Sequence, residues 1–414
     1  MKILMCNKFH FIHGGAERYL FDLSHGLQDA GCEVMDFSMK DPRNLESKYQ
    51  EFFVEKSDFV NPLHGGFFSK VMAAANFIYS HEAKRKVESL IERYRPQIAH
   101  VHNIYHQVSP AILEVFKKRK IPVVMTLHDY KIICPNYKLF VRGRICAQCR
   151  GQKYFHCLFN RCIKDSLPAS FLGMVEAYTH AFLKSYVAVD LFIVPSRFTY
   201  EKMLESGVPR TKLILLPCVV DLSVFSRRYE VGKYLLYFGR LLVEKGLLTL
   251  LDSLKDLPDV HLKIIGDGPF LAELKGLLKK RGLSRVEVLG HCSREGLDKF
   301  LRDALCVILP SEWPEPMGLV IHEAFAAGKC VIASSVGGIP ELVEDGVNGM
   351  LFEAGNPEDL GRKIKYVIAH PDQARQWGEN GALKVLQQGD HKAHVAQVKE
   401  IYCRLLSSRP MPQE

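Results

Sequence analysis

Residues 305–334 read LCVILPSEWPEPMGLVIHEAFAAGKCVIAS, which is an apolar strand, an apolar helix and a second apolar strand in succession. Pro316 fixes its own φ and lacks an N–H, so it suits the first position of a helix, with Glu315 at the cap. Gly328 is then expected to end that helix. A helix that joins two short apolar strands is typical of a parallel sheet covered on both faces.

The same alternation of strands and helices extends outward over the whole chain. The sequence predicts two doubly wound, Rossmann-like α/β domains that face each other across a ligand-binding cleft. The predicted N-terminal domain is 1–216, with a cysteine-rich insert at 131–165. The predicted C-terminal domain is 217–390, and a helix and polar tail at 391–414 are expected to pack back on either domain. The expected strands are 2–6, 31–38, 97–103, 122–129, 190–196, 234–241, 261–269, 286–291, 305–311 and 329–334.

Composition and charge indicate a folded protein with an anionic partner and no membrane-spanning segment. The chain has 414 residues, 47% of them hydrophobic, and a net charge of +9. Residues 1–216 carry roughly +10 and residues 217–414 roughly −1, so the first half is expected to face an anionic partner rather than only solvent. The chain opens on an apolar strand instead of a signal peptide, and its most apolar stretch, 181–195, is too short to span a bilayer. Most of the twelve cysteines are scattered singly, which indicates a reducing, cytoplasmic setting.

Two glutamates in the opening stretch, Glu315 and Glu323, are eight positions apart, and if helical they share one face. Alone, such a pair is an ordinary amphipathic pattern. In company with five other motifs it resembles a retaining glycosyltransferase of family four, with two Rossmann-like domains in the GT-B arrangement, over nearly the whole chain. The motifs are GGAER (14–18), TLHD (126–129), YFGRLLVEKG (237–246), IIGDGP (264–269) and GGIPELVEDGVNGMLF (337–352).

The resemblance implies a donor site for a UDP- or GDP-sugar in the C-terminal domain. Glu323 would hold the ribose hydroxyls, and Glu315 would bind the transferred sugar as a catalytic residue. Arg240 and Lys245 would clamp the diphosphate. A helix N-terminus would point its N–H groups at the phosphates. The residues at that N-terminus are Met317, where the family commonly has Phe, Gly318 and Leu319.

In the N-terminal domain the resemblance implies three further residues. Gly14 and Gly15 match a loop that closes over the phosphates. His128, at the end of a strand, matches a second catalytic residue that reaches the donor sugar, although a lone histidine is more often a hydrogen-bonded interior residue. No Asp-x-Asp stands where it could hold a metal against the diphosphate. We therefore expect hexosyl transfer without a metal cofactor and with retention of the anomeric configuration.

Five cysteines cluster in residues 134–162. The last four have the spacing C-x2-C, seven residues, C-x4-C, which fits a closed tetrahedral zinc site of structural type. Reduced thiols that pack a small subdomain, or a disulfide, are the alternatives. Similar inserts occur in bacterial family members that resemble polysaccharide-assembly enzymes. The predicted ligands are Cys146, Cys149, Cys157 and Cys162, with Cys134 or His156 as replacements.

Residues 131–164 carry eight lysines and arginines, with aromatic residues interleaved, and no acidic residue. Such a segment can dock on anionic lipid headgroups or on single-stranded nucleic acid. Because the resembled family binds its acceptor on the N-terminal domain, we expect a saccharide or polyprenyl-diphosphate-linked acceptor, peripheral contact with the inner face of the cell membrane, and no nucleic acid. A sugar-nucleotide epimerase of the same fold and a zinc-containing nucleic-acid-binding protein are the alternatives.

Overall fold

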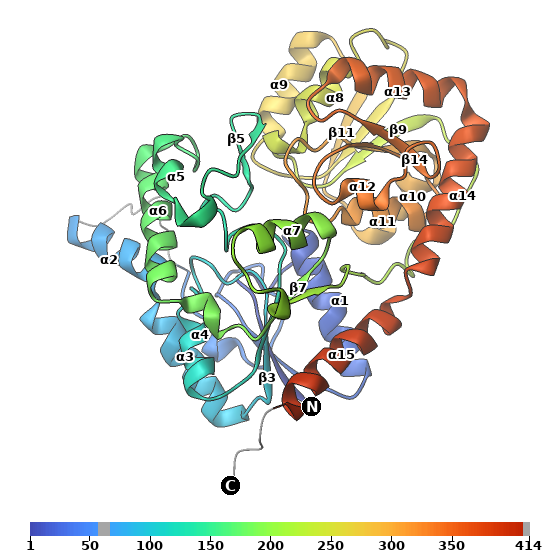
Figure 1. Cartoon of the computed structure of the whole chain (residues 1–414). Coiled ribbons are helices and arrows are strands. Elements are labelled where there is room, and N and C mark those ends of the chain that lie inside the picture. The colour runs from blue at the N-terminus through green and yellow to red at the C-terminus, as the bar shows by residue number, and fades with distance from the viewer. Residues whose placement is uncertain (57–66, 409–414) are drawn as a thin grey trace. The chain divides into compact units, whose positions relative to one another are not determined.

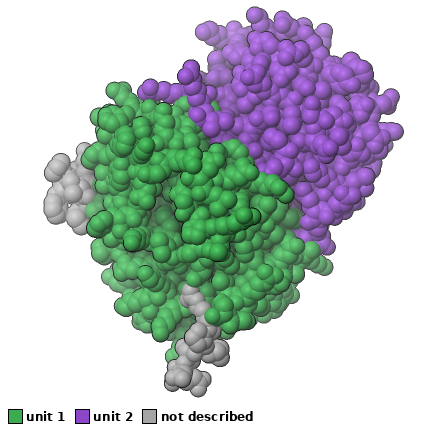
Figure 2. All heavy atoms as spheres, viewed as in Figure 1, with its two compact units in different colours: residues 1–141, 146–220, 392–414 green, residues 142–145, 221–391 purple. Residues whose placement is uncertain are grey.

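The computed structural model describes residues 1–56 and 67–408 (Figure 1). It divides into two compact units (Figure 2). Unit 1 comprises the described parts of Met1–Val141, Cys146–Val220 and Lys392–Glu414, and unit 2 comprises Arg142–Ile145 and Asp221–His391. The main stretch of unit 2 begins at Asp221, and the predicted C-terminal domain begins at 217. The end of the predicted polar tail, residues 409–414, lies outside the described residues.

Unit 1 is built on a parallel sheet with the strand order β2-β1-β3-β4-β7-β8. Ile3 of β1 pairs with Val34 on one side and Ile98 on the other, and all three are buried because helices cover both faces of the sheet. The strand order changes direction between β1 and β3, so their carboxyl ends flank a topological switch point. The strands are β1 (Lys2–Cys6), β2 (Glu33–Phe37), β3 (Ile98–Val101), β4 (Val123–Thr126), β7 (Leu191–Val194) and β8 (Leu213–Leu215).

Three helices of unit 1, α3, α6 and α7, begin after a serine that caps them. Ser166 accepts a hydrogen bond from Ala169 N, and Ser196 accepts one from Thr199 N. The last helix, α15, returns to unit 1, where Tyr402 Oη lies 2.5 Å from His100 Nδ1 of β3. The helices are α1 (Gly15–Asp29), α2 (Phe67–Ile78), α3 (His81–Tyr94), α4 (Ile112–Lys118), α5 (Phe155–Phe159), α6 (Leu167–Phe182), α7 (Arg197–Glu205) and α15 (His391–Ser407).

Unit 2 is built on a second parallel sheet, with the order β11-β10-β9-β12-β13-β14. Here the order reverses between β9 and β12. The strands are β9 (Tyr234–Phe238), β10 (Leu262–Ile265), β11 (Val286–Gly290), β12 (Ala304–Leu309), β13 (Val331–Ser334) and β14 (Gly349–Phe352). The helices are α8 (Leu247–Ser253), α9 (Leu271–Arg281), α10 (Arg294–Arg302), α11 (Leu319–Ala326), α12 (Ile339–Leu342), α13 (Pro357–Ala369) and α14 (Pro371–Gln387).

The predicted α/β class with two Rossmann-like domains is confirmed. One predicted boundary was wrong: α11 begins at Leu319 with Gly318 at its N-cap, so Glu315 and Pro316 precede the helix. The physical reason is that a residue before proline is driven away from the helical region, which affects Glu315 directly. The sequence also missed β8 and β14, which are short, and the small hairpin of β5 (Phe140–Val141) and β6 (Arg144–Ile145). Across the described residues, no helix has both the length and the apolar character needed to cross a membrane.

Candidate functional site

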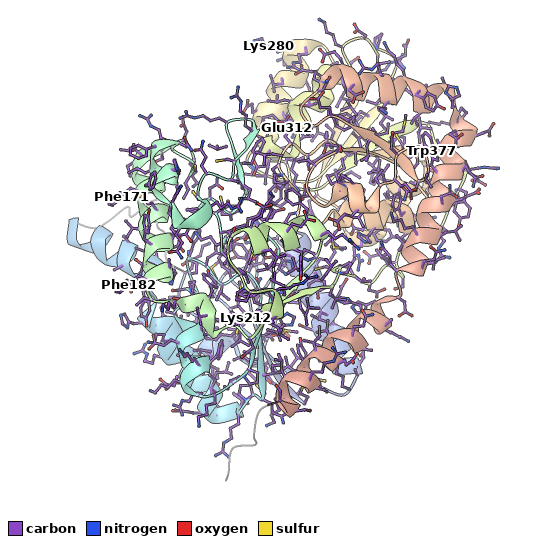
Figure 3. All side chains as sticks on the ribbon, viewed as in Figure 1. Phe171, Phe182, Lys212, Lys280, Glu312 and Trp377 are labelled. Atoms are coloured by element: carbon purple, nitrogen blue, oxygen red, sulfur yellow. The ribbon has the colours of Figure 1, made fainter. Side chains whose placement is uncertain are left out.

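The loop that follows β12 is fastened to the segment that follows β9. Glu244 O accepts hydrogen bonds from Glu312 N at 3.0 Å and Trp313 N at 3.4 Å. Thr249 Oγ1 on α8 donates to Glu312 Oε1 at 2.6 Å; Glu312 is labelled in Figure 3. These bonds hold the loop that carries Glu315 at the switch point of unit 2, which is where doubly wound sheets bind ligands.

Glu315 and Lys245 form a mostly buried ion pair at this point. Lys245 Nζ lies 2.5 Å from Glu315 Oε1, and Ser311 Oγ donates to the same oxygen at 2.6 Å. The Glu315 side chain is 7% exposed and the Lys245 side chain 19%. Because both bonds end on Oε1, the described residues leave Oε2 to accept a hydrogen bond from a ligand. The sequence named Lys245 and Glu315 but missed Ser311, and it missed Trp313, whose ring centroid is 5.4 Å from Lys245 Nζ.

Two glycines fix the backbone on either side of the pair. Gly246 has φ +72°, and a Cβ there would meet Pro310 O at 1.7 Å. Gly337 has φ +62°, and a Cβ there would meet Glu315 N at 2.6 Å and Glu315 O at 2.5 Å. Gly338 N then donates to Glu315 O at 2.8 Å. Close backbone approach therefore requires glycine at 246, in the first of these motifs, and at 337, in the second.

Arg240 follows β9 on the same segment as Lys245. Its backbone carbonyl accepts a hydrogen bond from Tyr237 Oη at 2.9 Å, while its side chain is exposed. No carboxylate in the described part of the chain pairs with its guanidinium. A cation that is anchored through its backbone and lacks a counter-charge is suited to bind an anion.

The remaining predicted donor residues lie around α11. Glu323 is buried, 6% exposed, in the second turn of the helix, whereas Glu315 lies outside it, so the predicted placement of both glutamates on one helix face was wrong. Met317 packs against the apolar core of unit 2, which agrees with a packing role for this departure from the family pattern. Gly318 is the N-cap and Leu319 the first helical residue. The N–H groups predicted to face phosphates therefore stand at the start of α11.

His128 lies at the carboxyl end of β4, within unit 1. Its Nε2 is 2.9 Å from His102 Nδ1, and the two rings stack with centroids 5.2 Å apart. Burial lowers the pKa of His128 to about 3, so the ring is neutral at pH 7. A neutral imidazole donates one hydrogen bond and accepts one, which leaves His128 Nδ1 for a ligand within the described residues. The partner His102 was not predicted. The one signal for it in the sequence is that the apolar strand ends in HVHN (100–103), with polar residues where apolar ones are usual.

Gly14 and Gly15 stand at the start of α1. Gly14 is the N-cap, has extended backbone (φ −173°, ψ −164°), and provides no side chain to cap the helix. The first-turn N–H groups therefore receive no capping bond from that position, which is the usual setting for an anion. Glu17 in the same turn is buried and accepts a hydrogen bond from Asn7 Nδ2 at 3.3 Å. The phosphate-facing role of the two glycines stays a prediction.

A polar network beside His128 was missed by the sequence. Tyr105 Oη donates to Asp129 Oδ2 at 2.5 Å, and Lys131 Nζ lies 2.6 Å from Glu176 Oε2 in a buried ion pair. Burial raises the pKa of both Asp129 and Glu176. A small cavity adjoins this network at the ends of β3 and β4. Its lining includes Asn103, Tyr105, Thr126, His128, Asp129 and Lys131.

The cysteine-rich insert brings all five of its cysteines to one cavity in unit 1. Burial raises the pKa of Cys134 to about 11 and that of Cys149 to about 12, so both thiols are protonated at pH 7. Among the described residues no disulfide forms, and no group of three or more cysteine, histidine or acidic side chains is arranged to hold a metal. The side chains as they stand do not form a zinc site, and zinc binding stays a prediction. The cysteines are Cys134, Cys146, Cys149, Cys157 and Cys162.

Two family models match the chain, one on each half. The model described as Glycosyltransferase Family 4 matches residues 13–224, and the model described as Glycosyl transferases group 1 matches residues 222–384. The second match contains Arg240, Lys245 and Glu315, and the first contains His128.

Similar proteins agree with these matches. An uncharacterized glycosyltransferase of Methanocaldococcus jannaschii is 38% identical over 381 residues, which cover 92% of each chain. A lipopolysaccharide core biosynthesis glycosyltransferase of Rhizobium meliloti is 31% identical over 42% of this chain and 49% of that protein. The crystal structure of Anabaena HepE in complex with UDP and glucose superposes with a TM-score of 0.70 at 20% identity, covering 98% of this chain and all of that one. That likeness shows the fold alone.

Proposed function

The chain belongs to glycosyltransferase family 4, and from this premise we propose that it transfers a hexose from a UDP- or GDP-sugar with retention of the anomeric configuration. The acceptor in this proposal is a saccharide or a polyprenyl-diphosphate-linked saccharide. The observation that carries the proposal is the Lys245–Glu315 pair at the β9–β12 switch point. Arg240, which pairs with no carboxylate among the described residues, lies on the same segment as Lys245. Anabaena HepE, which binds UDP and glucose, indicates which ligands to test first.

The leaving diphosphate gains negative charge as the bond to the sugar breaks. Arg240 would offset that charge directly, and Lys245 would add to the positive field from beside Glu315. The N–H groups at the start of α11 supply a further positive dipole end. Since the chain's own groups supply this positive field, we propose that transfer needs no metal ion.

The transferred sugar would be bound through hydroxyl groups. Glu315 Oε2 would accept a hydrogen bond from one hydroxyl, and the neutral ring of His128 would donate to or accept from another. Glu323 would hold the ribose hydroxyls of the nucleotide. The acceptor would attack on the face that the nucleotide leaves, which retains the configuration.

The setting in this proposal is the assembly of cell-surface polysaccharide at the inner face of the cell membrane. The Rhizobium meliloti relative acts in lipopolysaccharide core biosynthesis, which supports a saccharide acceptor. The acid-free basic segment at 131–164 supports peripheral attachment to anionic lipid at a cytoplasmic membrane surface.

The proposal is tested in two steps. Thermal stabilisation by a panel of nucleoside diphosphates and nucleotide sugars should single out one nucleotide, because a ligand of the folded state raises the melting temperature. Transfer with that donor should then give a product whose anomeric proton has the donor's configuration by NMR, and EDTA should not abolish it once any structural zinc is controlled for. Conversion of the donor sugar without an acceptor would indicate an epimerase instead. Salt-sensitive RNA binding without transfer would indicate the nucleic-acid-binding alternative.

A further inference from the structure

Helix α6 has an outward face without charge. Its only charged residue, Glu176, points inward and is paired with Lys131 at 2.6 Å. A helix on the surface of a soluble protein normally turns charged residues to solvent, so this pattern is unusual. Leu167, Phe171, Tyr178 and Phe182 are instead exposed, Phe182 at 87% and Phe171 at 53%; Figure 3 labels these two phenylalanines on α6.

The four exposed residues lie along one side of α6. Their spacings of four, seven and four residues keep them within about 60° around the helix axis. Helix α5 packs against α6 and continues the surface, since the rings of Tyr154 and Tyr178 are 5.2 Å apart. Phe155 and Phe159 of α5 are exposed as well, Phe159 at 74%. We call Phe155, Phe159, Leu167, Phe171, Tyr178 and Phe182 the α5–α6 aromatic face.

Basic residues flank both helices of this face. Exposed Lys153 precedes α5 and Arg161 follows it, while exposed Lys164 precedes α6 and Lys184 follows it. Between 150 and 189 the acidic residues are Asp165 and the buried Glu176. An apolar face with aromatic residues and a rim of lysine and arginine is typical of helices that lie in the interface of an anionic membrane.

We propose that the α5–α6 aromatic face inserts into the headgroup and acyl boundary of an anionic lipid surface, with the basic rim on the headgroups. This inference rests on the proposed function, because it assigns the peripheral attachment to anionic lipid proposed there to these two helices. A second copy of the chain fits the face less well, because a twofold contact would set the basic rim against an identical basic rim. The aromatic face alone would bind neutral and anionic lipid equally. The basic rim should therefore make binding to anionic lipid stronger than binding to neutral lipid.

The test is sedimentation of the full chain with vesicles of phosphatidylcholine alone or mixed with phosphatidylglycerol, at low and high salt. Wild type should bind the anionic vesicles. The variant Phe159→Ser, Phe171→Ser, Phe182→Ser should lose about tenfold or more in binding. The matched control Leu383→Ser, Leu386→Ser removes two leucines of α14 that are 54% and 51% exposed, and it should bind as wild type does.

The contribution of charge is tested by Lys153→Ser, Lys164→Ser, Lys184→Ser, with Lys279→Ser, Lys280→Ser on α9 as its control. The first variant should bind anionic vesicles weakly and lose most of the salt dependence, while the control keeps both. Unchanged vesicle binding in the aromatic variant, a dimer that this variant dissociates, or RNA binding that replaces vesicle binding would each overturn the proposal. Thermal stabilisation by the nucleotide should stay the same in every variant, so failure of the donor proposal is seen separately.

Discussion

Two cations in unit 2 that a motif places five residues apart have different surroundings, and this makes their roles separable. Arg240 is exposed and lacks a carboxylate partner among the described residues, so Arg240→Ala should leave the melting temperature of the free protein unchanged. The same change should weaken binding of the nucleoside diphosphate about tenfold to a hundredfold, the usual effect of losing hydrogen bonds to a charged group. Calorimetric titration with the nucleotide measures this, and Lys279→Ala is the control. Loss of stability without loss of affinity would show that Arg240 is structural.

Lys245 is different because Glu315 already partly neutralises it. Lys245→Met should leave the buried Glu315 carboxylate with Ser311 as its one remaining side-chain donor among the described residues, and cost about 3 kcal/mol of unfolding free energy. The double variant Lys245→Met, Glu315→Gln should recover most of that stability but no transfer activity, because the sugar and the diphosphate both lose a ligand. Urea unfolding and a transfer assay give the two readouts. Equal stability of the single and double variants would contradict a coupled pair.

The sequence could name Lys245 and Glu315 because both stand in recognisable motifs, but it could not show that they contact each other. Their contact depends on the order of β9 and β12 in the sheet, which brings residues 70 apart in the chain to one edge. For the same reason Ser311 and the Tyr105–Asp129 bond were missed. A serine at a strand end or a tyrosine in a loop is common in any sequence. Its role becomes visible only when the structure shows which residue it contacts.

At the scale of elements, the loop after β12 packs closely against Gly246, which leaves no room for a side chain there. Gly246→Ala should force the loop after β12 away and cost about 2 kcal/mol or more, because a Cβ meets Pro310 O at 1.7 Å and φ is +72°. Gly276→Ala on α9 is the matched control, since nothing lies within 4 Å of a Cβ there and alanine favours the helix. Thermal melting should therefore separate the two variants in opposite directions. A neutral Gly246→Ala would mean that the two loops are not held together.

Strands with continuous apolar runs, such as β1 and β12, were predicted because parallel strands buried on both faces need such residues. β8 has three residues, β14 begins at Gly349, and both lie at sheet edges, so neither shows a long apolar run in the sequence. The start of α11 was predicted three residues too early, at Pro316 instead of Leu319. Proline marks helix starts in general, yet here its effect on Glu315 and the bonds that hold the loop were stronger than the helical preference.

At the scale of the whole molecule, buried histidines are unequally shared between the units. Burial lowers the pKa of His100 and His128 to about 3 and that of His180 to about 4, and it also lowers the pKa of His102 and His106, all in unit 1. In unit 2 burial lowers the pKa of His322 to about 4. The raised pKa values of Asp129 and Glu176 favour the folded state as the pH falls, which opposes the effect of the histidines. These two carboxyl groups are fewer than the buried histidines of unit 1.

Unit 1 should therefore be the acid-sensitive unit. A histidine whose pKa is lower in the folded chain than in the unfolded one stays neutral while the unfolded chain takes up a proton, so stability falls as the pH drops from about 6.5 toward 3. Each such histidine contributes at most about 1.4 kcal/mol per pH unit. Calorimetry between pH 7 and pH 4.5 should show the melting temperature of unit 1 falling more than that of unit 2.

The variant His100→Asn loses the bonds to Tyr402 and Thr126, so it should be less stable than wild type at pH 7 but lose less stability than wild type on acidification. If wild type and His100→Asn lost the same stability on acidification, the result would contradict the assignment of this acid sensitivity to His100.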